Sequence, residues 1–142
     1  MSVEQNKTLD RRYFEEVYNR GNLNVVDELI GPQCLIHGPL GDVTGPQGIR
    51  QLLGSFLAAF SDVHYSVHEQ IGEGDWVATR WTAEGKHTAE LMGIPPSGKK
   101  FRLEGTTVSH VAQGKLVEVW HNYDNLGFMQ QIGAMPAPAV AR

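Results

Sequence analysis

Cysteine and long hydrophobic runs are nearly missing from this chain of 142 residues. Cys34 is the only cysteine, so no disulfide can form within the chain, which is typical of a protein from a reducing compartment. No apolar stretch reaches the roughly 20 residues that a membrane-spanning helix needs. The N-terminus carries Glu4 and has no apolar run after basic residues, so we expect no signal peptide. These absences predict a cytoplasmic protein with no membrane partner.

Clusters of positive charge are missing as well. The chain has 16 acidic and 12 basic side chains, and its net charge is −4 at pH 7. A nucleic-acid partner would require a basic face for its phosphates, so we expect none. A zinc site needs three or four convergent ligands, and no acidic side chain accompanies the histidines of this sequence to complete such a set. We therefore expect no metal ion and no cofactor.

The first 60 residues contain three segments with the period of an amphipathic helix. The first begins at a capping box formed by Ser2 and Gln5 and ends at Gly21. The second covers residues 22–31. The third begins at Thr44, which we expect to act as its cap, and runs to residue 60 with a wide apolar face.

After Asp62 the apolar residues alternate with a period of two, which predicts strands around residues 63–71, 76–83, 101–111 and 116–123. A short helix capped by Asp124 is expected to follow them. We predict one domain over residues 1–134 and a flexible tail, rich in Pro and Ala, over 135–142. The fold class is α+β: a cone-shaped, curved antiparallel sheet with three N-terminal helices packed on its concave face.

The odd-numbered strand residues are the more apolar set, so the helices should cover that face. Residues opposite each other in two strands share a face. We therefore predict a three-residue loop over 112–114 in the last hairpin, which places Gly105 opposite His121 with Thr107 as a diagonal neighbour. An imidazole beside a gap in an apolar shell suits a general base. The alternative is a core histidine bonded to a backbone carbonyl.

Other candidate site residues follow from the inner face and the helix stripes. Thr107 and Tyr123 are expected to bond a substrate oxygen, His37 to enter the pocket mouth, and His87 to lie near it, although a surface histidine is the alternative for the last two. The remaining wall is apolar and aromatic: Tyr13, Phe56, Tyr65 and Trp81.

The even-numbered face mixes charged residues with Trp76, Val108 and Trp120. This composition is typical of a subunit interface and predicts a homo-oligomer, a dimer or a tetramer. A solvated sheet with partly covered tryptophans is the alternative.

Several segments, in this order, resemble the SnoaL-like polyketide cyclases, which belong to the wider group with the nuclear-transport-factor-2 (NTF2-like) cone fold. They are YFEEVYNRGNLNVVDELI (13–30), LIH (35–37), TGP (44–46), EGKHTAELMGIPPSGKKF (84–101), GKLVEVW (114–120) and DNLGFMQQIG (124–133). The resemblance implies a deep apolar cavity and a cofactor-free aldol closure of a polyketide ester by an acid–base carboxylate. That carboxylate aligns with His121 of this chain, and a partnering histidine aligns with Thr107.

The sequence thus predicts a cyclase-like enzyme that acts on a small apolar carbonyl compound. His121 is the expected base, and His37 and Thr107 are the further catalytic candidates. One alternative is a binding protein with the same pocket and no chemistry. Another is an epoxide hydrolase, which would require acids and an arginine in the cavity, whereas Glu69 is the only acid expected on the inner strand positions.

Overall fold

The computed structural model describes residues 1–39 and 41–136. The predicted flexible tail therefore lies outside the described residues, apart from its first two. The helices are α1 (Val3–Arg12), the π-helix η1 (Tyr13–Asn19), the 3₁₀ turn η2 (Leu23–Val25), α2 (Val26–Leu29), α3 (Gly45–Ala59) and α4 (Asn125–Gln131). Four helical segments precede the first two strands, α3 lies between those and the four long strands, and α4 follows the last strand.

Six strands form one sheet in the order β2-β1-β6-β5-β4-β3. The pairs are antiparallel except β1–β6, which is parallel, so the sheet is mixed rather than purely antiparallel. The strands are β1 (Ile30–Gly38), β2 (Gly41–Thr44), β3 (Phe60–Glu73), β4 (Trp76–His87), β5 (Lys100–Ala112) and β6 (Lys115–Tyr123).

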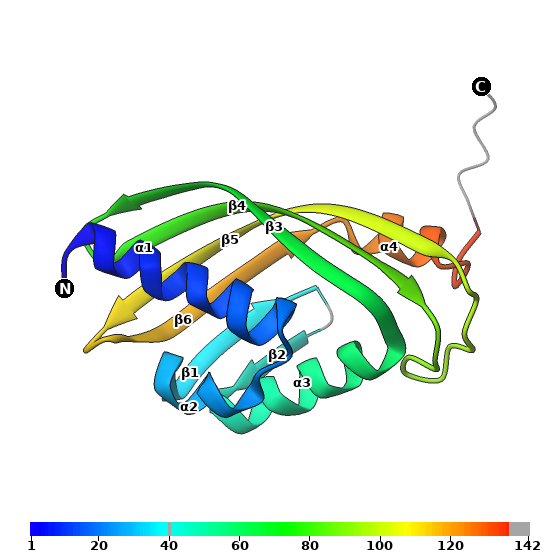
Figure 1. Cartoon of the computed structure of the whole chain (residues 1–142), viewed down its shortest axis with the longest axis horizontal. Helices are drawn as coiled ribbons and strands as arrows, with labels where there is room; N and C mark the ends of the chain where they lie inside the picture. The colour runs from blue at the N-terminus through cyan, green and yellow to red at the C-terminus, as the bar shows by residue number, and fades with distance from the viewer. Residues whose placement is uncertain (40, 137–142) are drawn as a thin grey trace.

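The long strands β3 to β6 curve, and the N-terminal helices lie on the concave side (Figure 1). This arrangement confirms the predicted α+β cone. The core lies between the helices and the inner sheet face, where Phe14, Ile49 and Val119 are fully buried. The outer face of the sheet carries no helix in Figure 1, which leaves its side chains available to solvent or to a partner.

The first helix begins as predicted, because Ser2 and Gln5 form both bonds of a capping box. It then widens into the π-helix η1, whose backbone bonds join residues five apart. Tyr13 and Tyr18 are five apart and both buried, and their hydroxyl oxygens lie 3.1 Å from each other. The π-helix thus aligns two phenols on one inner face.

The start of α3 differs from the prediction. Thr44 precedes the helix but makes no capping hydrogen bond with its side chain. The backbone turns at Gly45, whose φ is +69°, and a β-carbon there would collide with the carbonyl oxygen of Pro32. Glycine is required at this position because it alone tolerates both the positive φ and the close approach.

The turn of the last hairpin also differs from the prediction. Ala112 pairs with Lys115 around the two-residue turn Gln113-Gly114, whose φ values of 53° and 76° fit a type I′ turn. The predicted three-residue loop is therefore wrong. The register shifts immediately afterwards, with Val117 as the extra residue of a β-bulge, and odd residues again face odd residues.

The bulge decides which side chains meet on the inner face. Thr107 lies directly opposite His121, and Gly105 lies opposite Tyr123, so the predicted pairing of Gly105 with His121 is wrong. The missing side chain of Gly105 leaves no gap beside the histidine. A β-carbon there would overlap the ring of Trp81, which occupies that space.

The cap of α4 gives a test of this local analysis. A carboxylate oxygen of Asp124 accepts a bond from the backbone N–H of Gly127 at 2.8 Å, as predicted for a cap. We expect Asp124→Ala to lower the free energy of unfolding by about 1 kcal/mol, and Asp124→Asn to keep nearly all of it, since the amide oxygen accepts the same bond. Urea denaturation measures both. Equal losses in the two variants would show that the charge, rather than the cap, stabilises this end.

Candidate functional site

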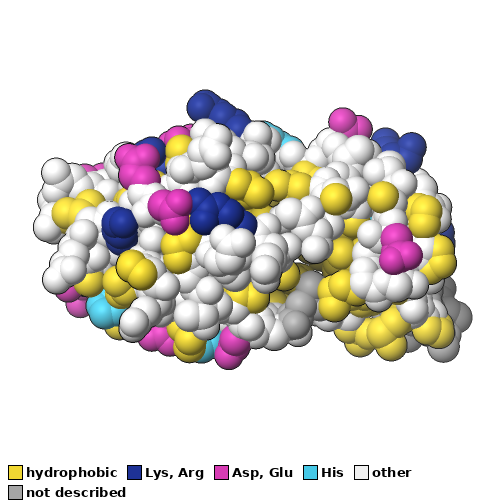
Figure 2. Space-filling model, turned by 90° about the horizontal axis from the view of Figure 1, so that it is seen from below, with side chains coloured by type: hydrophobic (Ala, Val, Ile, Leu, Met, Phe, Trp, Pro, Cys, Tyr) yellow, Lys and Arg dark blue, Asp and Glu magenta, His cyan; other side chains and the backbone are white. Residues whose placement is uncertain are grey.

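A pocket opens between the concave sheet face, α3 and the segment around Leu91. It contains about 840 Å³ of empty space, including its open mouth. Figure 2 shows hydrophobic side chains gathered around a narrow recess in the surface. The wall is mostly apolar and draws on almost every element, with contributions from Ile36, Leu52, Leu53, Phe56, Tyr65, Trp81, Leu91, Leu103, Tyr123 and Phe128.

Five of the predicted site residues contribute to this wall: His121, Phe56, Tyr65, Trp81 and Tyr123. They come from α3 and from β3, β4 and β6, so no single motif could have revealed them together. Odd-numbered strand positions and the apolar stripe of a helix identified them, because those two patterns mark the sides that face the core.

His121 is the pocket residue at which hydrogen-bonding side chains adjoin the apolar wall. Its Nδ1 lies 2.7 Å from Oγ1 of Thr107, and its Nε2 lies 3.2 Å from the hydroxyl oxygens of both Tyr13 and Tyr18. Burial lowers the pKa of the His121 imidazole to about 4, because a charged ring would lose its hydration there. The ring is therefore neutral around pH 7 and is a weak base.

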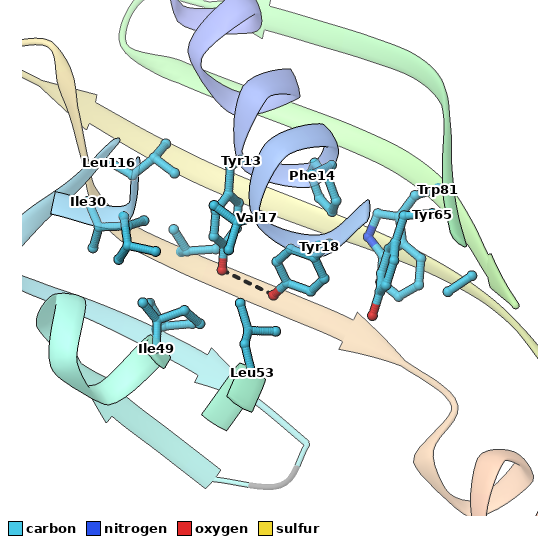
Figure 3. Packing of buried hydrophobic residues seen from close by; sticks show 14 of the residues in the cluster. Tyr13, Phe14, Val17, Tyr18, Ile30, Ile49, Leu53, Tyr65, Trp81 and Leu116 are labelled. Carbon is cyan, nitrogen blue, oxygen red and sulfur yellow. Dashed lines mark hydrogen bonds between the residues drawn. The ribbon is translucent and has the colours of Figure 1, made fainter. Parts of the chain in front are cut away.

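Tyr18 is the site residue that the sequence did not single out. It lines the pocket, and its hydroxyl contacts both His121 and Tyr13, as the dashed bond in Figure 3 shows for the second of these. Burial raises the pKa of its phenol well above 10, so the hydroxyl keeps its proton. Its position in a helical stripe marked it as core, and the π-helix that turns it towards His121 has no sequence signal.

Thr107 and Tyr13 are close to the pocket but do not line it. Thr107 is fully buried, and its hydroxyl accepts a bond from the indole N–H of Trp81 at 2.8 Å besides contacting His121. Thr107 is therefore not among the residues that line the pocket, and its bond to a substrate oxygen stays a prediction. Tyr13 is also fully buried and is absent from the pocket wall, so its predicted place there is wrong too.

His37 lies on the outer face of the sheet. Its neighbour Ile36 lines the pocket, and successive strand residues point to opposite faces. The ring of His37 contacts Glu118 at 2.8 Å and Asp42 at 3.2 Å and stacks on Trp120. The hydrogen bond with Glu118 raises the pKa of His37, followed in effect by the bond with Asp42. The predicted position of His37 at the pocket mouth is wrong.

His87 is buried outside the pocket wall. It packs against Phe60, with ring centroids 5.1 Å apart, and its Nδ1 accepts a bond from the backbone N–H of Ser97 at 3.2 Å. The expectation that it contacts a pocket ligand is not met by this arrangement. Its role is to hold the segment that follows β4 against the core.

The inner carboxylate is not the predicted one. The register of β3 and β4 shifts between Val67 and Glu69, and Glu69 pairs on the exposed face with Arg80. Asp10 of α1 is instead fully buried and accepts bonds from the hydroxyls of Thr79 and Ser109. Burial raises the pKa of Asp10 despite these bonds.

Asp10 could have been found from the sequence. It lies four residues after the buried Asn6 and three before Tyr13, and this spacing places it on the inner side of the helix. Thr79 and Ser109 occupy odd-numbered strand positions, which belong to the inner sheet face, and buried hydroxyls need partners. Asp10 does not line the pocket, and we assign it a structural role.

Residues 1–39 and 41–136 contain no group of three or more His, Cys, Asp or Glu side chains arranged to hold a metal ion. Among the same residues, no helix is long and apolar enough to cross a membrane. Burial raises the pKa of the Cys34 thiol to about 12, so it stays protonated.

The fold and the pocket define an NTF2-like cone protein, and comparison with known proteins narrows the class. The family model of the SnoaL-like polyketide cyclases matches residues 8–132, and the chain belongs to this family. Nogalonic acid methyl ester cyclase of Streptomyces nogalater is 32% identical over 119 residues, which cover 82% of this chain and 89% of the relative.

Two further relatives agree with this assignment. Aklanonic acid methyl ester cyclase DnrD of Streptomyces peucetius is 29% identical, with 86% of this chain and 87% of that protein covered. The crystal structure of IdmH, a putative polyketide cyclase from Streptomyces antibioticus, superposes with a TM-score of 0.78 at 33% identity and covers 91% of this chain and 99% of IdmH. The resemblance found in the sequence is confirmed.

The lowered pKa of His121 gives a prediction for stability. A histidine in the unfolded chain has a pKa near 6.5. Between pH 6.5 and 4 the His121 ring is therefore protonated in the unfolded state but neutral in the folded state. The neutral His121 therefore contributes fully to the free energy of unfolding above pH 6.5. This contribution falls by about 3 kcal/mol in all as the pH is lowered towards 4.

Chemical denaturation at several pH values measures this loss. We expect His121→Asn to have a shallower fall in stability between pH 6.5 and 4 than the wild-type protein. The matched control is His64→Asn, which changes an exposed histidine of β3 and should follow the wild-type curve. Identical slopes for His121→Asn and the wild-type protein would show that the ring titrates normally in the folded state.

Proposed function

We propose that this chain is a cyclase that closes a ring in a polyketide-derived keto ester by an intramolecular aldol reaction. The observation that carries the proposal is the hydrogen-bonded pair of His121 and Tyr18 in the wall of a mostly apolar pocket. Its family supports the same reaction class, and so do the relatives named as methyl ester cyclases.

The proposed reaction is an isomerisation. The carbon between two carbonyl groups loses its proton to water at the open mouth of the pocket and forms a bond to a second carbonyl carbon. The oxygen of that second carbonyl becomes an alkoxide and takes up a proton in return. No atom is gained or lost in the sum. Negative charge develops on oxygen in both steps, and a fixed hydrogen-bond donor in a dry pocket stabilises such charge strongly.

Tyr18 is the proposed hydrogen-bond donor to this oxygen, and His121 is the proposed donor behind Tyr18. Both are neutral around pH 7, because burial lowers the pKa of the imidazole and raises that of the phenol. A neutral imidazole is a useful partner for an oxygen that becomes negative, as in other enzymes that keep a histidine uncharged. The low pKa argues against the strong base role expected from the sequence.

The pocket supports a small, largely apolar substrate with few oxygens near the wall. Phe56, Tyr65 and Trp81 present aromatic surface on which a planar ring system could pack. The described lining residues include no Asp, Glu or Arg, so an epoxide hydrolase finds no support in the geometry. The weak basicity of His121 favours one second candidate, a binding protein without turnover.

Turnover of nogalonic acid methyl ester, followed by absorbance, separates the two candidates. If His121 supports the Tyr18 donor, His121→Ala should lower kcat by roughly 100-fold. The matched control His64→Ala, on an exposed part of β3, should keep wild-type activity. The rate of the wild-type enzyme should show no step from His121 between pH 5 and 8, because the ring is neutral throughout.

Two outcomes would contradict the proposal. Tight binding of the ester without any product in the wild-type protein favours the binding protein. Product formation that survives in His121→Ala at the wild-type rate shows that another group handles the proton.

We also propose that two copies of the chain associate through the outer sheet face. Four rings lie in a row there: His110 stacks on Trp76, Trp76 on Trp120 and Trp120 on His37. Trp76 is 45% exposed. Glu118 and Asp42 contact His37 at one end of this row, and the ion pair of Arg80 and Glu69 lies on the same sheet face, so the face carries both charge signs for a symmetric contact with itself.

Trp120→Glu tests this association. A carboxylate at the centre of the contact would be buried without a partner, and we expect the oligomer to dissociate. Light scattering gives the mass of both proteins, and near-unchanged circular dichroism of the variant would show that its fold persists. A monomeric wild-type protein at micromolar concentration would contradict the proposal.

A further inference from the structure

The hydrogen bonds around His121 form a continuous chain that can be assigned a direction. The chain runs from Trp81 through Thr107 and His121 to the phenols of Tyr13 and Tyr18. We infer that this chain has one orientation and that it ends with the Tyr18 hydroxyl donating its proton to an oxygen of the molecule in the pocket. The identity of that molecule rests on the function proposed above, but the orientation does not.

Trp81 fixes the first link. An indole N–H can only donate, and it lies 2.8 Å from the hydroxyl oxygen of Thr107. Thr107 is fully buried, so its own proton needs an acceptor. Trp81 cannot accept it. The remaining contact of this hydroxyl among the described residues is Nδ1 of His121 at 2.7 Å, and the proton therefore points there.

The second link follows from the chemistry of a neutral imidazole. Nδ1 accepts the proton of Thr107 and so carries no hydrogen, which leaves the ring proton on Nε2. Nε2 lies 3.2 Å from the hydroxyl oxygens of Tyr13 and Tyr18 and donates towards them. In this tautomer His121 offers no free lone pair to the pocket.

The last link separates the two phenols. Tyr13 is fully buried and contacts His121 and Tyr18 among the described residues. Because Nε2 already carries a proton, the hydroxyl of Tyr13 donates to the hydroxyl oxygen of Tyr18, 3.1 Å away (Figure 3). Tyr18 then accepts at its oxygen and retains its own proton without an acceptor among the described residues.

Tyr18 lines the pocket, whereas Tyr13 does not. The free proton of the chain is therefore offered where a ligand binds. Each group behind Tyr18 donates in the same sense, and aligned hydrogen bonds polarise one another. The pocket thus selects ligands that place an acceptor oxygen, a carbonyl or an oxyanion, next to Tyr18, and Tyr18 becomes a substrate-contacting residue.

Nuclear magnetic resonance of the imidazole nitrogens tests the orientation without any substrate. We expect His121 to carry its proton on Nε2 in the wild-type protein at pH 7. Thr107→Val removes the donated bond while keeping the shape, so the two tautomers should become mixed. The matched control is Thr106→Val, one residue along β5 on the exposed face, which should leave the tautomer unchanged.

Binding of two isosteric probes tests the terminal donor. The probes are 2-acetylnaphthalene, which has a carbonyl oxygen, and 2-isopropenylnaphthalene, which has a CH₂ group at the same place. The wild-type protein should bind the ketone about two- to tenfold more tightly than the alkene, which is the usual effect of one hydrogen bond on affinity. Tyr18→Phe should abolish this preference. Tyr13→Phe should keep it, because Tyr18 still holds its own proton.

Several results would overturn the inference. They are a His121 proton on Nδ1 in the wild-type protein, equal or absent binding of the two probes, and equal loss of the preference in Tyr18→Phe and Tyr13→Phe. None of these measurements needs catalysis. If the protein binds the ketone as expected but never cyclises an ester, the proposed function is refuted, whereas the donor at Tyr18 is established.

Discussion

Polar groups on the concave side of this sheet must find their partners inside the protein, because the helices close that side to water. Two buried clusters meet this constraint. Asp10 binds the hydroxyls of Thr79 and Ser109, and the chain from Trp81 ends at Tyr18. Both clusters join the first helix to β4, β5 or β6, so the same bonds that satisfy the polar groups also fix the helix on the sheet.

Irregularities of the backbone place these groups. The π-helix brings Tyr13 and Tyr18 together, and the bulge in β6 brings Thr107 opposite His121. A regular helix or an unshifted hairpin would have separated them. Such features are often found at functional sites, because they redirect a side chain at little cost to the rest of the element. In this chain they converge on one end of the pocket.

The sheet separates two different surfaces. The inner face supplies an apolar pocket with His121 and Tyr18 in its wall, while the outer face carries stacked rings and exposed ion pairs such as Arg80–Glu69. Strand alternation lets one segment serve both: Ile36 faces the pocket and the next residue, His37, binds Glu118 outside. The pocket and the surface proposed for association of two copies therefore use different side chains.

The positions of the helices and long strands, the inner position of His121 and the membership of a cyclase family were all predictable from the sequence. These depend on periodic patterns and on the order of short segments, which are local properties. The capping box at Ser2 and the cap at Asp124 were predictable for the same reason, because each side chain binds a backbone N–H only three residues away.

The contacts between side chains could not be predicted in the same way, because they depend on how the strands pair in the folded protein. Glu69 was expected inside and lies outside, and Thr107 binds His121 rather than facing the pocket. A single bulge moves every later residue of a strand to the opposite face. Where a bulge forms depends on the burial and hydrogen bonding of segments far apart in the chain, and no local pattern records those.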